Sequence, residues 1–251
     1  MAANQPIPDW QLPPGVDRGL WDYLNSTEMA AGYDEQMAAS PLARADVAFC
    51  EKWFPEPGKL LDMGCGTGRL CLYFAKKGFE CVGVDLSEEM LAKARTLQEA
   101  HSMPRVGSGS ANFIQANLID LKQWPDSSFE YAACLFSTLG MIRGEENRVQ
   151  VLANAFRLLK PGGRFVLHVH NRYFPGLGWR NWGKGDITMP QAYGGAPLTL
   201  FHFTLRDILL RLAEMGFEVK EVRAVGIDGA EPRWPRRLRA YGYLLAGEHR
   251  A

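Results

Sequence analysis

The sequence predicts an α/β protein with a Rossmann-like, doubly wound, seven-stranded and mostly parallel sheet. Short apolar runs alternate with helical stretches from about residue 58 onward, and Gly and Pro separate them. This alternation is typical of helices covering both faces of a parallel sheet. A glycine-rich turn joins the first apolar run to the first helical stretch. The composition, with 47% hydrophobic residues over 251, is that of a globular protein with a sizeable core.

The first two strands are expected over residues 59–63 and 81–85. Between them a helix is expected over residues 69–77, because its apolar positions recur at helical spacing and Gly78 suits a C-cap. Ser87 stands where the next helix needs an N-cap, and two glutamates follow it in the first turn.

The remaining elements follow the same logic. Residues 101–110 are expected to form a loop, and a helix over residues 145–159 is expected to stop at Lys160-Pro161-Gly162-Gly163. Another helix, over residues 205–215, ends at Gly216. The other five strands are expected over residues 111–116, 129–136, 164–170, 217–226 and 241–247.

Two segments of the single expected domain, residues 1–251, fall outside the alternation. Residues 1–57 are expected to form a helical cap, with one helix starting at Ser40-Pro41. Residues 171–203 have no clear period but are rich in Gly and aromatic residues. Loops of that length are usually functional or disordered, and the aromatic content argues against disorder. We expect this segment to be an insertion that forms a substrate lid.

The most informative stretch runs from Leu60 to Arg69, where a strand leads into three alternating glycines and then a helix. Such a turn brings the backbone close to a ligand at the carboxyl edge of the sheet. Asp85 ends the second strand, where a carboxylate can accept both hydroxyls of a ribose. The dinucleotide pattern G-x-G-x-x-G would need a glycine at position 69, where this chain has Arg69. The acid Asp62, two residues before the first glycine, would also repel a phosphate bound beside the turn. A ligand that carries an ammonium group suits the stretch better than a dinucleotide does.

These residues resemble the D-x-G-x-G-x-G motif and second acid of the class I S-adenosylmethionine-dependent methyltransferases, including the small-molecule and quinone-type members. The resemblance covers about residues 30–250 and includes Tyr33-Asp34, Leu159 to Gly163 and Tyr243 to Ala246. It implies S-adenosylmethionine as cofactor and an antiparallel last strand. The cofactor-binding residues that it implies are Tyr33, Asp62, Gly64, Cys65, Gly66, Gly68, Asp85, Leu86, Met90, Asn117, Leu118 and Phe136. Asn117 stands where the family commonly has an acid.

The resemblance implies methyl transfer to a small molecule, and His170 is the candidate general base. His168 and His170 share one face of the fifth strand, and His170 is nearer the carboxyl edge. A buried, hydrogen-bonded structural role is the alternative for both histidines. The candidate substrate residues are Trp21, Tyr23, Asn171, Trp179, Trp182, Tyr193 and His202. The alternative for the lid is a subdomain that only packs on the sheet.

Composition bears on the partners of the chain. Twenty-eight basic residues balance 28 acidic ones, which argues against a general nucleic-acid binder. Residues 233–239 hold four arginines, so an RNA methyltransferase stays open, as does a non-catalytic cofactor-binding module.

We expect no membrane span, since no run of about 18 apolar residues occurs. Five scattered cysteines without a CxxC pair predict reduced thiols, a cytoplasmic location and no metal site.

Overall fold

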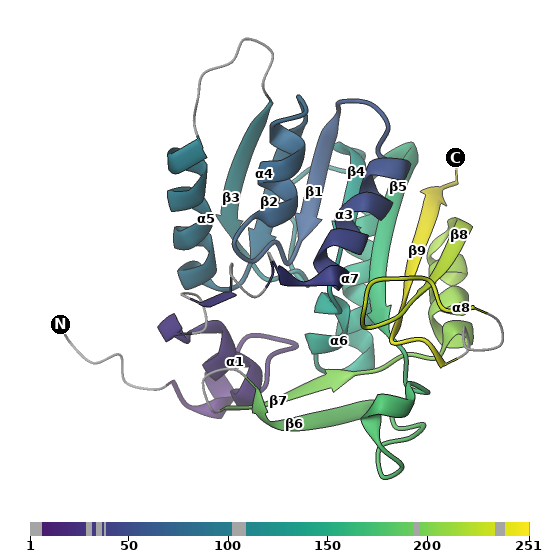
Figure 1. Ribbon diagram of the computed structural model, residues 1–251. Coiled ribbons are helices and arrows are strands. Elements are labelled where there is room, and N and C mark those ends of the chain that lie inside the picture. Colours follow the sequence, from purple (N-terminus) through teal and green to yellow (C-terminus); the bar gives the residue numbers. More distant parts are fainter. Residues whose placement is uncertain are drawn as a thin grey trace.

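The computed structural model describes residues 7–28, 32–33, 37, 39–101, 109–192, 196–233 and 239–250. Its main sheet has seven strands in the order β3-β2-β1-β4-β5-β9-β8 (Figure 1). They are β1 (Lys59–Met63), β2 (Glu80–Asp85), β3 (Ser110–Gln115), β4 (Phe129–Cys134), β5 (Leu159–His170), β8 (Phe217–Val225) and β9 (Gly242–His249). Only β9 runs antiparallel to its neighbours, β5 and β8. The predicted fold class is confirmed, including the antiparallel last strand.

Helices cover both faces of this sheet and form two hydrophobic cores with it. One face carries α3 (Pro41–Trp53), α4 (Arg69–Ala75) and α5 (Glu88–His101), whose side chains share one core. The other face carries α6 (Thr138–Met141), α7 (Glu145–Leu158) and α8 (Leu205–Met215). Among the described residues, no helix is both long and apolar enough to cross a bilayer.

Side-chain caps explain where several helices begin. The Ser40 hydroxyl accepts a hydrogen bond from Ala43 N at 3.3 Å, at the start of α3. Ser87 accepts from Met90 N at 3.3 Å, and Thr204 accepts from Asp207 N at 3.0 Å. These bonds satisfy amide groups that have no partner within the helix. The predicted N-cap at Ser87 is therefore confirmed.

The fifth strand begins earlier than predicted. We expected the helix to reach residue 159 and to stop at residues 160–163. Instead α7 ends at Leu158, and β5 already starts at Leu159. Gly162 has a φ of +76°, and the pairing with β4 shifts register between Phe129 and Tyr131. This irregularity lets the Pro-Gly-Gly stretch run alongside β4 without a regular ladder.

Residues 171–203 contain a two-stranded antiparallel ribbon that the sequence analysis missed. It pairs β6 (Asp186–Ala192) with β7 (Ala196–Phe201). The strands were missed because residues 171–203 show no clear period, and each strand contains a proline, Pro190 or Pro197. A ribbon of two edge strands tolerates proline, and the pairing is irregular between Met189 and Ala192. A 3₁₀ turn, η2 (Pro175–Leu177), precedes the ribbon.

The N-terminal segment divides between two places. A 3₁₀ turn, η1 (Asp9–Gln11), leads to α1 (Arg18–Leu24), which packs against β7 beyond the carboxyl ends of the parallel strands (Figure 1). By contrast, α3 packs on β5 and β9 as part of the helical layer. Of the expected loop over residues 101–110, positions 102–108 lie outside the described residues, as do Tyr193 and residues 234–238.

Candidate active site

The turn between β1 and α4 has a backbone that only glycine adopts readily. Gly64, Gly66 and Gly68 have φ values of +82°, +53° and +77°. The amides of Gly64 and Cys65 both donate to Val84 O, at 2.8 and 3.0 Å, and this ties the turn to the end of β2. A Cβ atom on Gly64 would lie 2.4 Å from the Thr138 methyl group. The turn therefore needs glycine both for its backbone angles and for its contact with α6.

Asp85 closes the other side of this turn. Its Oδ2 accepts a hydrogen bond from Gly66 N at 2.8 Å, and its Oδ1 accepts from Ser87 N at 2.9 Å. Burial raises the pKa of Asp85, and the hydrogen bonds from these amides oppose that rise. The carboxylate thus lies at the carboxyl edge of the sheet, on the rim of a cavity.

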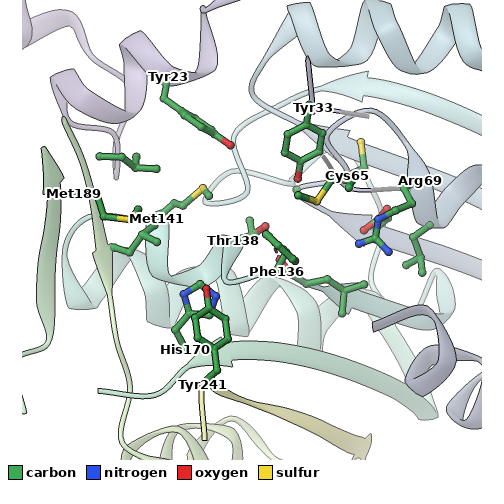
Figure 2. A pocket seen from close by; sticks show the side chains of 17 residues that line it. Tyr23, Tyr33, Cys65, Arg69, Phe136, Thr138, Met141, His170, Met189 and Tyr241 are labelled. Carbon is green, nitrogen blue, oxygen red and sulfur yellow. Dashed lines mark hydrogen bonds between the residues drawn. The ribbon is translucent and has the colours of Figure 1, made fainter. Parts of the chain in front are cut away.

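Two cavities meet at this edge, and we name them after Asp85 and His170. The Asp85 cavity is otherwise lined mainly by apolar side chains, with Asn117 among the polar ones. The His170 cavity extends away from the glycine turn toward β5 and the ribbon. Five residues line both cavities: Tyr23, Tyr33, Gly64, Thr138 and Met141. Figure 2 shows the His170 cavity, with His170 and Tyr241 on the side opposite Tyr23 and Tyr33.

The end of the His170 cavity nearest the glycine turn carries two charged side chains, Asp62 and Arg69. Asp62 is 3% exposed, and burial raises its pKa to about 7, an effect that the nearby Arg69 guanidinium partly opposes. Cys71 Sγ lies 3.7 Å from Asp62 Oδ2. Burial also raises the pKa of Cys65, which keeps this thiol protonated and a poor nucleophile.

The chain after β4 adopts a strained conformation beside the cavity. Phe136 and Ser137 have φ values of +50° and +63°, which non-glycine residues seldom adopt. Phe136 lines the His170 cavity, and Ser137 immediately precedes α6. Strain of this kind is often found at binding sites, where the surrounding structure maintains it.

His170 reaches the cavity from the end of β5. It is 5% exposed, and its Nε2 atom has no hydrogen-bond partner among the described residues. Burial is the main reason that its pKa is well below the usual value, with smaller contributions from His168 and His202. The imidazole is therefore neutral near pH 7. The Tyr241 ring packs against it, with 4.6 Å between ring centroids.

The structure brings most of the predicted cofactor residues together. Gly64, Gly66, Asp85, Leu86, Met90, Asn117, Leu118 and Tyr33 line the Asp85 cavity, and Asp62, Cys65 and Phe136 line the His170 cavity. Gly68 lines neither, because it precedes α4, where a Cβ would lie 2.5 Å from the Phe113 ring. The Asn117 side chain donates to Pro14 O and accepts from Ile119 N.

The predicted substrate residues are more scattered. Only Tyr23 of the described ones lines a cavity. Asn171 is buried, and its side-chain amide donates to Ala240 O at 2.9 Å. The His202 ring lies next to the His170 ring, with 5.5 Å between ring centroids, and does not line the cavity. Trp179 and Trp182 are 83% and 42% exposed and line neither cavity. Trp21 does not line them either. Tyr193 lies outside the described residues.

Sequence reasoning missed much of the wall of the His170 cavity. Its residues that were not predicted include Arg69, Thr138, Met141, Met189, Leu198, Leu200 and Tyr241. The alternation of Leu198 and Leu200, both buried, was a signal for a strand with one face turned to the cavity. The others come from segments without a periodic pattern.

Comparison with known proteins agrees with this architecture. Residues 60–163 match a family described as a methyltransferase domain. The chain is 31% identical over 150 residues to the ubiquinone/menaquinone biosynthesis C-methyltransferase UbiE of Geobacter sulfurreducens, covering 59% of this chain and 52% of the relative. It is 28% identical over 191 residues to ajmaline N-methyltransferase of Rauvolfia serpentina, covering 70% and 62%. The CcbJ methyltransferase of Streptomyces caelestis has a similar fold, with a TM-score of 0.69, 20% identity, and coverage of 91% and 99%.

Residues 60–163 are therefore similar to a methyltransferase domain, and the strand order of the sheet agrees with the class I S-adenosylmethionine-dependent fold that the sequence predicts. The matched family spans residues 60–163, which hold the glycine turn, Asp85 and the end of β4. The chain spans about half of the length of the curated relatives it matches, between 48% and 56% for three of them.

S-adenosylmethionine is the cofactor of this class, and the residues present fit it. The glycine turn leaves room for a ligand against the backbone, Asp85 lies at the end of β2, and apolar side chains line the cavity beside it. Asp62 is an acid at the other end of the turn.

Proposed function

We propose that the protein transfers the methyl group of S-adenosylmethionine to a small, uncharged and largely apolar acceptor with a protic group beside His170. One observation carries this proposal. The Asp85 cavity continues into the His170 cavity, and both share the wall formed by Tyr23, Tyr33, Gly64, Thr138 and Met141. A ligand along the glycine turn would thus present its middle to the cavity that His170 lines.

The Asp85 cavity supports binding of the adenosine half of the cofactor. The Asp85 carboxylate accepts two backbone amides and has further lone pairs for ribose hydroxyls. Leu86, Met90 and Leu118 give the cavity apolar surface for the adenine ring. Asp62 is the candidate partner of the ammonium group, whose positive charge would favour the ionised carboxylate.

The charges of the His170 cavity support an uncharged acceptor. Among the described residues that line it, the acidic side chain is Asp62 and the guanidinium is Arg69, and both lie beside the glycine turn. The opposite end presents Met189, Leu198 and Leu200. A charged acceptor at that end would lose its hydration without gaining a counter-ion, which costs several kcal/mol (order of magnitude).

His170 supports the chemistry of proton removal. The bound cofactor supplies an electrophilic methyl group on a sulfonium, so the protein has to align the acceptor, exclude water and accept any proton that leaves. A neutral imidazole at the cavity wall can accept the proton of a hydroxyl or amine. The same step serves a carbon acceptor activated by a ring hydroxyl, so oxygen, nitrogen and carbon acceptors all stay open.

The cover of the cavity supports exclusion of water. Met189, Leu198 and Leu200 come from the ribbon, and Tyr23 comes from α1. Arg143, between α6 and α7, forms ion pairs with both segments, because its guanidinium lies 3.3 Å from Asp17 Oδ2 and 3.0 Å from Asp186 Oδ1. We therefore propose that α1 and the ribbon, which belong to the expected cap and lid segments, cover the cavity, whereas Trp179 and Trp182 do not line it.

A non-catalytic cofactor-binding module is the second candidate function. It would be favoured if side chains filled the space beyond the glycine turn. The open His170 cavity, of about 160 Å³, instead supports an enzyme. The relatives described above are named as methyltransferases of a quinone pathway and of an alkaloid, which supports a small-molecule acceptor.

The test has two stages. Calorimetry should detect S-adenosylmethionine binding to the wild type and a loss of at least tenfold in Asp85→Ala, whereas Asp120→Ala, an exposed acid, should bind normally. No binding by the wild type would refute the proposal. A screen of fractionated small molecules with methyl-labelled cofactor then identifies the acceptor, with His170→Ala as the control for label transfer at the site.

A further inference from the structure

Arg69 is a charged residue at the site that has no part in the proposed function. It is the first residue of α4 and follows the glycine turn directly. Its side chain is 28% exposed and lines the His170 cavity (Figure 2), as Asp62 also does. Its Nη1 donates to Ala43 O of α3 at 2.7 Å, and its Nη2 lies 3.7 Å from Asp46 Oδ2.

These contacts use only part of the hydrogen-bonding capacity of the guanidinium. In the part of the chain that the structure describes, Ala43 O is its only hydrogen-bond acceptor, since 3.7 Å is too long for a hydrogen bond to Asp46. A guanidinium has several N–H donors in a planar fork, which matches the two oxygens of a carboxylate. Arg69 can therefore bind a carboxylate in the cavity while its contacts with α3 remain.

Asp62 and Arg69 together place an acid that a bound cation would ionise and a guanidinium at one end of one cavity. Asp62 is almost fully buried there, and Arg69 is near enough to influence its ionisation. A ligand with only one charge would satisfy one of these groups and repel the other. An amino-acid zwitterion satisfies both, with its ammonium at Asp62 and its carboxylate at Arg69.

We propose that Arg69 binds the carboxylate of the methionine half of the cofactor and that Asp46 is a positioning residue that holds Arg69 against α3. This inference rests on the proposed function. The carboxylate of an acceptor molecule would have the same chemistry, but a binary complex without acceptor separates the two sources.

Asp46 suits this positioning role because it is buried and held from two sides. Its Oδ1 lies 2.7 Å from His168 Nδ1 on β5, and its Oδ2 faces Arg69. Both Asp46 and His168 are 0% exposed. The carboxylate is therefore fixed by the sheet on one side and orients the guanidinium through charge on the other.

The experiment compares two ligands by calorimetry. S-adenosylhomocysteine carries the amino-acid group, and 5′-methylthioadenosine has the same adenosine and thioether but lacks it. Arg69→Gln is expected to weaken binding of S-adenosylhomocysteine at least tenfold and to change binding of methylthioadenosine less than twofold. Arg69→Lys, which keeps the charge, should recover part of the loss. The matched control is Arg44→Gln, an exposed arginine of α3 outside the cavity, which should leave both affinities unchanged.

The Asp46 role is tested by the same pair of ligands. Asp46→Asn is expected to weaken S-adenosylhomocysteine severalfold and to leave methylthioadenosine unchanged, because it removes the charge that orients Arg69. A merely structural role would weaken both ligands alike and would overturn the positioning role.

The remaining outcomes are also decisive. If the wild type binds S-adenosylhomocysteine and Arg69→Gln binds it equally well, the carboxylate site is elsewhere and the proposed function stands. If Arg69→Gln weakens both ligands equally, Arg69 has no role toward the carboxylate. If the wild type binds neither ligand, the proposed function and this inference both fail.

Discussion

The carboxylate of Asp46 and the imidazole of His168 form a fully buried pair, with 2.7 Å between Oδ1 and Nδ1. The pair joins α3 to β5 across residues far apart in the chain. Removing one partner of such a pair leaves the other buried and uncompensated. Replacing both with apolar residues avoids that penalty.

We predict that Asp46→Ala lowers the free energy of unfolding by about 1–3 kcal/mol, because it leaves His168 Nδ1 buried without its hydrogen-bond partner. The double variant Asp46→Leu, His168→Leu is expected to be less destabilised than this single variant. Urea titration followed by circular dichroism measures both. Equal destabilisation of the two variants would mean that lost packing, rather than a stranded polar group, dominates.

The raised pKa of Asp62, about 7, predicts a pH effect in the ligand-free protein. An acid with a higher pKa in the folded state holds its proton when the unfolded chain has lost it, so stability falls as pH rises from about 4 to 7. Asp62→Asn should remove this contribution. Melting temperatures of both proteins between pH 4.5 and 8 measure it, and parallel pH profiles would contradict the assignment.

His170 predicts the opposite behaviour on acidification. Its pKa in the folded state is well below the usual value, so only the unfolded chain gains a proton as pH falls below about 6.5. Stability should therefore fall with falling pH, and His170→Gln should reduce that loss.

In the enzyme assay His170→Ala should lower kcat by about 10²- to 10⁴-fold if His170 is the general base. An unchanged kcat would remove it from that role.

Gly64→Ala is expected to disrupt the glycine turn. The new Cβ would meet Thr138 at 2.4 Å in a backbone with a φ of +82°. We expect a loss of about 1–3 kcal/mol of stability from the backbone angle alone, and weaker cofactor binding. Adding Thr138→Ala removes the contact with the threonine methyl group but not the unfavourable angle, so it should restore only part of both. Full restoration would show that the angle costs nothing here.

The ribbon predicts a contrast between two exposed apolar residues. Met189 lines the His170 cavity, whereas Trp179 does not. Met189→Ala should raise KM for the acceptor while leaving cofactor affinity unchanged. Trp179→Ala should change neither and should alter stability by less than about 0.5 kcal/mol. Steady-state kinetics with the identified acceptor decides between them, and a large effect of Trp179→Ala would restore the tryptophan lid.

The glycine turn could be predicted closely because its chemistry is local. Three glycines and two acids define the loop within one β-α-β unit, and the strands and helices around it follow short-range patterns. The wall of the His170 cavity could not be predicted this way. Tyr241 reaches it from the segment before β9, and Arg69 depends on contacts with α3 that only tertiary packing creates. The ribbon was missed because residues 171–203 show no clear period, and its two strands are paired with each other rather than with the main sheet.

The contact between Gly19 and Pro197 has a consequence for changing acceptor specificity. A Cβ atom on Gly19 would lie 1.9 Å from Pro197 O, so α1 and β7 meet backbone to backbone. Neither can be exchanged alone for the matching segment of another enzyme without disturbing this junction. A chimera that alters specificity should therefore transplant residues 15–24 and 186–201 as one unit, although more than 150 residues separate them in the chain.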